Sequence, residues 1–458
     1  NNSSTTSNDK MSKTGRCLYA PQNGMNPKQI VLLEKLISVV DSGSKIYDVL
    51  IACEPIVMQL QINQASFRPL CADGNSRSAA LKSLQSWMSH MYPDSGAGTI
   101  WELSADVHGV IAKSCLKRDS VFMTIPREAM LTATSDTLSL DPICTQVPSV
   151  ALTLQLIREI RKANLSSHCK YLTALPSPKS SNINPAWVWS TNEIDTLLST
   201  TSAYSSALRS KLSTIQYYIY LVARVRLPSD LLAMSWAEWL WASAIVLSRQ
   251  NELHDGILAL VPCWDMCNDK STGARSFYLS DSDQLVSEVT EPIVAGEQIY
   301  INYGERSSAH LLVYQGYVDP DHFTPIVIQP TMHDLQPGSD ELDKLRSLLF
   351  SKRSLATAPM TISIEGVISD GLMWTARLAC LDKHSAAILL RNPSLPRISS
   401  DNEIAARYVL AQYLQLRCSD LQRGFERTLA LMQSRNADLA ATLIRKEQRI
   451  LNACIDSI

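Results

Sequence analysis

Two stretches of the chain carry most of the information about its fold. The first, Val261–Asp269, reads V-P-C-W-D-M-C-N-D, and the second, Ala295–Ala309, reads A-G-E-Q-I-Y-I-N-Y-G-E-R-S-S-A. The apolar run Ile257–Val261 leads into the first stretch and predicts a buried strand. Within the second stretch, Gln298–Asn302 predicts another strand, and a helix is expected to begin at Ser307.

These stretches resemble two motifs of the SET-domain protein methyltransferases, in the branch that contains the Rubisco large-subunit lysine methyltransferase. The segments Trp264–Asp269 and Glu297–Ser307 are most similar to the actin-histidine N-methyltransferases of that branch. Both motifs stand in the family's order and spacing, and a weaker match covers most of the chain from about residue 75 onward. The resemblance implies an α+β fold, in which a SET-domain β-fold is split by a helical insertion and followed by an all-α C-terminal substrate-binding domain.

The resemblance and the residue pattern together predict five segments. The Ser/Thr/Asn-rich N-terminal stretch lacks an apolar core, which favours a disordered tail over a signal peptide or a membrane anchor. The apolar run Leu231–Leu247 contains Glu238, so a buried helix is favoured over a membrane span. The five segments are a disordered tail, 1–27; N-terminal helices with the first SET segment, 28–132; the helical insertion, 133–250; the second SET segment with the catalytic tyrosine, 251–330; and the helical C-terminal domain, 331–458.

Apolar residues at helical spacing predict most of the helices. Ser120–Ile125 predicts a strand, and residues 276–290 alternate in a way that predicts a small hairpin. The expected helices are Lys28–Val40, Ser78–His90, Ser149–Ala163, Ser166–Leu175, Ser190–Leu198, Ser205–Val225, Ser229–Gln250, Asp340–Lys352, Gly371–Lys383, Asp401–Met432 and Asn436–Ile458.

Composition narrows the class of protein and of partner. The net charge of the 458-residue chain is −2 and no basic block stands out, which argues against a nucleic-acid partner. Eleven scattered cysteines are an odd number without framework spacing, so reduced thiols in the cytosol are expected. No cysteine cluster follows Tyr303, and we predict no metal. We expect a cytoplasmic monomer that can also enter the nucleus, with no membrane partner.

The resemblance implies S-adenosyl-L-methionine as the cofactor. Arg77, ten residues before Trp87, matches an arginine that contacts this cofactor in the family, and a planar guanidinium can bind both oxygens of the methionine carboxylate. Taken alone, Arg77 also fits a solvated charge at a helix entry. Asp106–Ala112 corresponds to the family's glycine-containing loop, but only Gly109 remains and Val107 stands where the family usually has glycine. Because backbone approach is easiest at glycine, this departure could weaken cofactor binding.

The first motif implies further cofactor contacts. Asn268 matches the asparagine of the family's Asn-His pair, whereas Asp269 replaces the histidine. The replacement is tolerable if that position acts through its backbone, and it lowers affinity if the side chain is needed. Asp265 is interpreted as receiving the cofactor's ammonium or a backbone donor, with capping of the local turn as the alternative. The residues that the resemblance assigns to the cofactor are Arg77, Asp106, Val107, His108, Arg249, Asp265, Met266, Cys267, Asn268, Asp269 and Gln315.

Tyr303 is the residue to which the resemblance gives the catalytic role. Methyl transfer from a sulfonium is an in-line displacement that needs an uncharged nucleophile and an excluded solvent. The family's tyrosine at this point closes the channel between cofactor and substrate, and its hydroxyl can receive weak C–H···O contacts from the methyl group. A core tyrosine is the alternative interpretation.

Asn251 is expected to select the substrate. It matches the asparagine of the histidine-specific enzymes, whereas lysine-specific relatives carry an aromatic residue there. An amide oxygen that accepts from one imidazole N–H fixes the tautomer and leaves the other nitrogen's lone pair free. A helix C-cap is the alternative role. The resemblance further implies that the substrate contacts the side chains of Trp264, Leu253, Ile301 and Arg306.

The leading hypothesis is a protein-histidine N-methyltransferase that acts on actin. A protein-lysine methyltransferase on the same scaffold is the enzymatic alternative. A lysine nucleophile would first have to lose a proton, starting from a pKa of ~10.4. A SET-type binding module that has lost catalysis is the third hypothesis, and Asp269 and the loop at Asp106–Gly109 favour it.

Overall fold

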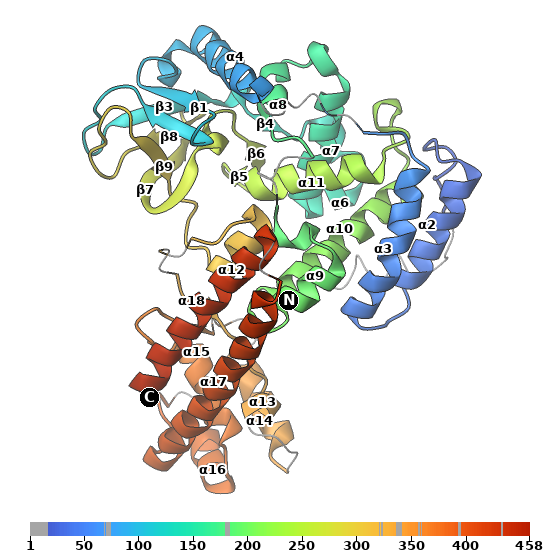
Figure 1. The fold of residues 1–458 in the computed structure, drawn as a ribbon. Coiled ribbons are helices and arrows are strands. Elements are labelled where there is room, and N and C mark those ends of the chain that lie inside the picture. The colour runs from blue at the N-terminus through green and yellow to red at the C-terminus, as the bar shows by residue number, and fades with distance from the viewer. Residues whose placement is uncertain are drawn as a thin grey trace. The chain divides into compact units, whose positions relative to one another are not determined.

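The computed structural model contains helices and strands that divide into two compact units (Figure 1). It describes residues 17–67, 69, 75–178, 184–319, 321, 324–335, 341–355, 358, 360–392, 395–431 and 434–458. Within these, unit 1 comprises residues 17–191, 207–304 and 314–316, and unit 2 comprises 192–206, 305–313 and 317–458. The mixture of a β-sheet with helices confirms the predicted α+β class.

Unit 1 begins with a helical hairpin, α2 (Pro27–Val40) and α3 (Ile46–Ile62), whose two helices pack side by side (Figure 1). The predicted disordered tail is wrong for its described part, residues 17–26. Asn23 is 2% exposed, and its side-chain amide donates to the carbonyl oxygens of Val222 and Val225 at 3.0 and 2.8 Å. These two carbonyl oxygens lie at the C-terminal end of the helix Tyr204–Arg224, and the hydrogen bonds from Asn23 to them hold this stretch in place. Residues 1–16 lie outside the described residues.

Six strands from distant parts of the chain form the main sheet of unit 1. Its order is β1-β2-β9-β7-β8-β3, with β7 and β9 parallel and the other pairs antiparallel. The helix α4 (Asn75–Met91) packs against β1. The strand predicted at Ser120–Ile125 and the hairpin predicted at 276–290 are both confirmed. The strands are β1 (Trp101–Ser104), β2 (Gly109–Ala112), β3 (Val121–Pro126), β7 (Asn268–Leu279), β8 (Gln284–Glu288) and β9 (Gln298–Ile301).

A second sheet joins the two ends of the helical insertion. It has the order β4-β6-β5, formed by β4 (Leu131–Thr132), β6 (Leu258–Leu260) and β5 (Asn251–Glu252). β4 precedes the insertion and β5 follows it, so the inserted helices leave and rejoin the fold at one small sheet.

The insertion consists of helices, as predicted, but not all of the expected bounds hold. The helix predicted over Ser229–Gln250 is wrong at its start, because a short 3-10 helix covers Ser229–Leu231 and α11 begins at Trp236. Ser235 caps α11 in a capping box with Glu238. The helix predicted over Ser166–Leu175 shortens to Cys169–Ala174. The described helices of the insertion are α5 (Ser135–Leu138), α6 (Pro142–Gln146), α7 (Pro148–Arg161), α8 (Cys169–Ala174), α9 (Thr191–Leu198), α10 (Tyr204–Arg224) and α11 (Trp236–Arg249).

Unit 2 is mainly helical and has its own apolar core. The helix predicted over Gly371–Lys383 is wrong at its end: α15 stops at Ala379, and a separate helix starts at Lys383 because the Asp382 side chain accepts from the Ser385 backbone N–H as an N-cap. The elements are α12 (Ser308–His310), a π-helix (Leu311–Gln315) whose last two residues belong to unit 1, β10 (Ile326–Val327), α13 (Met332–Leu335), α14 (Asp343–Lys352), β11 (Thr361–Ile362), α15 (Asp370–Ala379), α16 (Lys383–Arg391), α17 (Ser400–Leu429) and α18 (Arg435–Ser457).

Three further observations bear on function. No helix among the described residues is long and apolar enough to cross a membrane. The described cysteines are all free thiols. In the same described residues, no group of three or more His, Cys, Asp or Glu side chains is arranged to hold a metal ion.

Candidate active site

The first motif forms a tight turn between β6 and β7. Cys263 adopts φ 67°, a left-handed conformation that is uncommon for a residue with a side chain, and a 3-10 helix then covers Trp264–Met266. The backbone N–H of Asp265 donates to the Val261 carbonyl oxygen at 3.0 Å, which closes the turn. A strained backbone persists only where surrounding contacts hold it in place. The strained residue Cys263 lies just before the predicted cofactor residues Asp265 and Met266.

Tyr303 ties the second motif to the first. Its hydroxyl donates to the Cys267 carbonyl oxygen at 2.8 Å, and its backbone N–H donates to Asp269 Oδ1 at 2.9 Å. Burial raises the pKa of the Tyr303 phenol well above its ordinary value, and the nearby Arg249 guanidinium opposes that shift. The phenol is therefore neutral at physiological pH, with its proton directed at the Cys267 carbonyl oxygen.

A buried ionic cluster stands beside this pair. Asp265 Oδ2 accepts a short hydrogen bond from the Tyr171 hydroxyl and lies 3.7 Å from Arg249 Nη1, which also donates to the Asp265 carbonyl oxygen at 2.6 Å. Burial raises the pKa of the Asp265 carboxyl, and the positive charge of Arg249 lowers it again. Asp265 Oδ1 is buried and has no hydrogen-bond partner in the described part of the chain. Sequence reasoning missed Tyr171, because a tyrosine inside an insertion helix carries no motif.

Arg77 belongs to the same cluster. Its side chain is buried, its Nη1 donates to the Ala174 carbonyl oxygen at 3.0 Å, and its charge contributes to lowering the pKa of Asp265. The alternative of a solvated helix-entry charge is therefore wrong, because α4 packs on α8 and covers the guanidinium. Arg77, Arg249 and Asp265, which are far apart in sequence, are brought together.

The loop between β1 and β2 is held against the first motif at Gly109. A Cβ at this position would lie 2.3 Å from Gln298 Nε2 and 3.0 Å from Asn268 Nδ2, so a larger residue would have to displace the amide end of the Gln298 side chain. Asn268 Nδ2 also donates to the Val107 carbonyl oxygen at 3.3 Å. His108 takes a positive φ of 49° in the turn between them. The one glycine that the loop retains is thus packed closely against the side chains of Gln298 and Asn268.

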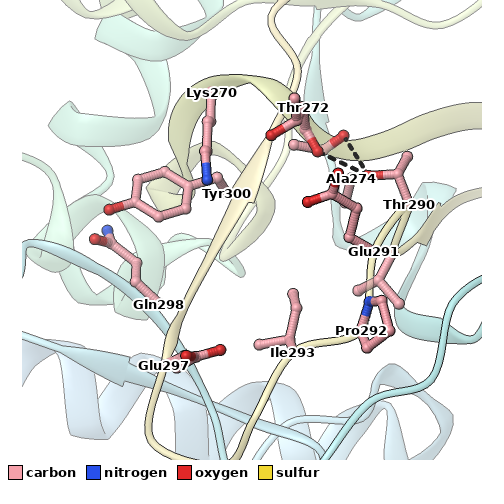
Figure 2. Close-up of a pocket in the computed structure, with 12 residues that line it drawn as sticks. Lys270, Thr272, Ala274, Thr290, Glu291, Pro292, Ile293, Glu297, Gln298 and Tyr300 are labelled. Carbon is pink, nitrogen blue, oxygen red and sulfur yellow. Dashed lines mark hydrogen bonds between the residues drawn. The ribbon is translucent and has the colours of Figure 1, made fainter. Parts of the chain in front are cut away.

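A hollow of about 430 Å³ opens in the main sheet beside the bulge of β7, which lies between Asp269 and Ala274 (Figure 2). Lys270 Nζ lies 5.8 Å from the centre of the Tyr300 ring, and the Thr290 hydroxyl donates to the Thr272 carbonyl oxygen at 2.7 Å (Figure 2). Polar side chains line much of the hollow, and none of the predicted site residues does. We therefore do not assign the cofactor to it.

The comparisons with known proteins agree with this geometry. Residues 338–451 match the family model described as "Rubisco LSMT substrate-binding". Solved structures of the SET domain of LSMT bound to lysine and AdoHcy, and of Rubisco LSMT bound to AdoMet, superpose with TM-scores of 0.61 and 0.58 at 19% and 18% identity. They cover 83% and 82% of this chain and 91% of each solved chain.

This chain has the SET-domain fold of Rubisco LSMT. Curated relatives named actin-histidine N-methyltransferase, from Gallus gallus and Mus musculus, are each 24% identical over 94% of this chain and 78% of their own length. A relative of the same name from Danio rerio is 26% identical over 65% of this chain and 52% of its own length.

The residues of this SET fold suit a cofactor with an amino-acid end. A buried carboxylate oxygen without a partner, Asp265 Oδ1, can receive an ammonium, and the neighbouring guanidiniums of Arg249 and Arg77 can receive a carboxylate. Gly109 provides close backbone approach beside Asn268. The predicted alternative of turn capping for Asp265 is not observed, because its side chain bonds to Tyr171 and Arg249 instead.

Asn251 begins β5 and pairs with Ala259 of β6. The alternative role as a helix C-cap is wrong, since Gln250 is the C-cap of α11. The Asn251 side chain makes no hydrogen bond within the described part of the chain, so its amide is available to a ligand. Two residues earlier, Arg249 is close enough to Tyr303 to lower its pKa.

The other predicted substrate residues divide between the units. Trp264, Leu253 and Ile301 are buried in unit 1, and the Trp264 indole N–H donates to Ser276 Oγ at 2.9 Å. Arg306 belongs to unit 2, where its Nη1 lies 2.7 Å from the Nε2 of His310. Its contact with a substrate stays a prediction.

The remaining predicted cofactor residues are also described. Met266 and Cys267 are buried behind the turn, and Asp106 lies in the loop before β2. Gln315 ends the π-helix, and its Oε1 is buried without a hydrogen-bond partner among the described residues. An unsatisfied buried oxygen of this kind is expected where a ligand donor completes the site.

Proposed function

We propose that this chain is an S-adenosylmethionine-dependent protein methyltransferase that transfers a methyl group to a histidine imidazole nitrogen of actin. The observation that carries the proposal is the pairing of the Tyr303 hydroxyl with the Cys267 carbonyl, next to the buried Arg249–Asp265 pair. The LSMT fold and the relatives named actin-histidine N-methyltransferase support the activity and the substrate. We expect the protein to act as a monomer in the cytoplasm, with the nucleus as a second location.

When bound, S-adenosylmethionine supplies an electrophilic methyl group on a sulfonium. Arg249 and Arg77 would bind its carboxylate, Asp265 Oδ1 its ammonium, and Asn268 with the 106–109 loop would hold the rest of the molecule. The Tyr303 oxygen, whose proton is committed to Cys267, would accept weak contacts from the methyl hydrogens. Because Tyr303 is neutral and buried, it adds no competing nucleophile.

Asn251 supports histidine as the acceptor. Its amide oxygen would accept from one imidazole N–H, so that the lone pair of the other nitrogen faces the methyl group. Transfer forms an N–C bond as the S–C bond breaks, with the bonding pair left on sulfur, and the methylated ring then loses its remaining N–H proton to solvent. No strong base is needed, because imidazole is largely neutral at pH 7.

Two departures from the family motif are compatible with an active enzyme. The Asp269 carboxylate bonds to the backbone N–H of Tyr303, which gives it a role in the site. In the 106–109 loop, Val107 replaces a glycine, but Gly109 is retained and packs closely against Gln298 and Asn268. These contacts weigh against a binding module that has lost catalysis. Lysine transfer remains the second candidate, because the superposable LSMT structure is bound to lysine.

The test is incubation of the purified chain with monomeric actin and methyl-labelled S-adenosylmethionine, followed by mass mapping of the labelled residue, with Tyr303→Phe as the inactive control. Label on a histidine supports the proposal, and label only on lysine establishes the alternative. If no label is transferred and calorimetry detects no cofactor binding, the protein is a binding module and the proposal fails.

A further inference from the structure

A second cavity, of about 290 Å³, lies within the helical insertion and contains none of the residues assigned to methyl transfer. Its walls come from α7, α10 and α11, the first and last of which pack together (Figure 1). Tyr314 closes one side, where its hydroxyl and Ser210 Oγ are 2.9 Å apart. The volume corresponds to about ten water molecules in the liquid, or a ligand of roughly ten non-hydrogen atoms.

The interior surface is apolar. Val150 and Trp239 are almost fully buried and line the cavity together with Leu247. The Trp239 indole N–H already donates to the Thr214 carbonyl oxygen at 3.0 Å, so the indole offers the cavity apolar ring surface rather than a donor. This lining favours a hydrocarbon body over a fully polar ligand.

Several hydroxyl groups on the lining have no partner. Ser243 is 4% exposed, yet its hydroxyl makes no hydrogen bond within the described residues. The same holds for the hydroxyls of Ser213 and Tyr217, which line the cavity from α10. Burial raises the pKa of Tyr217, which keeps this phenol a donor at physiological pH. Buried hydroxyls are normally hydrogen-bonded, so the buried Ser243 indicates a ligand with an acceptor atom, to which the partly exposed Ser213 and Tyr217 can also donate.

The charges on the lining have one sign. Arg209 lines the cavity, and no Asp or Glu does. The N-terminus of the 14-residue helix α7 opens on the same cavity at Val147 and Ser149, without a side-chain cap. An arginine and an uncapped helix N-terminus both favour a negative group.

We propose that this cavity binds a small organic anion that has an apolar body and a carboxylate head, with the head at Arg209 and the body against Trp239. The inference does not depend on the proposed methyl transfer, because it uses none of the same side chains. The ligand would complete the hydrogen bonds of Ser243 and Tyr217 and cover the exposed part of Leu247.

The probe is octanoate, with octanol and octylamine as compounds of matched chain length and different head group, and binding to the full chain is measured by calorimetry and by quenching of tryptophan fluorescence. Octanoate is expected to bind saturably, and octanol and octylamine at least tenfold more weakly. Arg209→Gln should weaken octanoate binding about tenfold, because a charge-assisted hydrogen bond is lost. Arg226→Gln, an exposed arginine outside the cavity, is the matched control and should bind octanoate as wild type does.

A cavity-filling variant, Ser243→Leu, should abolish binding, and its thermal unfolding is recorded to show that it folds. Because Arg209 is exposed, Arg209→Gln tests the inference even if Ser243→Leu does not fold. The inference is overturned if octanoate binding does not saturate, if octanol binds as tightly as octanoate, or if Arg209→Gln binds octanoate like the wild type.

Discussion

The hydroxyl of Tyr303 donates a hydrogen bond of 2.8 Å to the carbonyl oxygen of Cys267, and this contact joins the two motifs across the β7–β9 pair. Tyr303→Phe removes the oxygen that would accept methyl C–H contacts. We expect the turnover number to fall about 10²-fold, while cofactor affinity changes little, because the Arg249–Asp265 pair is untouched. Single-turnover kinetics with calorimetry separate the two effects.

Tyr220→Phe is the control for this substitution, since the Tyr220 hydroxyl bonds to Asp141 in the insertion and has no role in the proposed site. A Tyr303→Phe enzyme with wild-type turnover would remove Tyr303 from the mechanism.

Asp269 offers a test of whether the departure from the family's histidine is functional. Its Oδ1 holds the backbone N–H of Tyr303 at 2.9 Å. Asp269→Ala should lower turnover about tenfold because Tyr303 loses an anchor, whereas Asp269→Asn keeps an acceptor oxygen and should stay near wild type. Steady-state kinetics of both variants measure this, and wild-type turnover of Asp269→Ala would show that the side chain is dispensable.

Tyr171 is expected to act through Asp265. Tyr171→Phe removes a hydrogen bond to a buried carboxylate, which should lower the free energy of unfolding by about 1–3 kcal/mol and weaken cofactor binding. Urea denaturation and calorimetry measure the two quantities. A variant that loses stability but binds the cofactor normally would reduce Tyr171 to a purely structural residue.

Asn251→Phe tests substrate choice. The variant places the aromatic residue of the lysine-specific relatives at the start of β5, and it removes the amide that would fix the imidazole tautomer. Histidine methylation should fall about tenfold or more in the assay with labelled cofactor. Glu252→Ala, at the exposed neighbouring position, is the control. An unchanged rate for Asn251→Phe would contradict the role assigned here.

Glu447 predicts a pH dependence of unit 2. Its buried carboxylate accepts from the Ser202 backbone N–H at 3.1 Å and from the Ser202 hydroxyl at 2.5 Å, and burial raises its pKa from the ordinary 4.5 to about 7. Since the folded pKa is the higher one, its contribution to stability is complete below pH 4.5 and is lost as pH rises through 7. The loss is on the order of 3 kcal/mol.

Urea denaturation of wild type and Glu447→Gln from pH 5 to pH 8 isolates this effect. His310, whose pKa is lowered to about 4 by burial, gives an opposite slope in both proteins, so the difference between them is the relevant quantity. The stability of Glu447→Gln relative to wild type should rise with pH. A difference that stays constant over this range would show that Glu447 titrates near its ordinary value.

Local sequence patterns predict those helices whose ends are marked by capping residues next to them in the sequence. The helices near Lys28–Val40 and Asp401–Met432 were predicted to within a few residues, because their apolar spacing and N-terminal caps are local. Helix breaks at Ser235 and Asp382 were missed, since both caps lie inside apolar runs that read as continuous helix. The α3 helix, which contains Pro55, was not predicted.

The two motifs and the helical character of the insertion follow from the sequence alone, because motif order and spacing are visible without coordinates. The roles of Tyr303, Asn251 and Asn268 are predictions that the resemblance implies. Tertiary folding alone brings the Tyr171 hydroxyl and the charge of Arg77 to Asp265, the Asp269 carboxylate to the Tyr303 backbone, and Gln298 to Gly109. These pairings link residues as much as 189 positions apart (Gly109 to Gln298) through packing, charge and hydrogen bonding. Such pairings depend on how helices pack on the sheet, and local residue patterns carry no information about that packing.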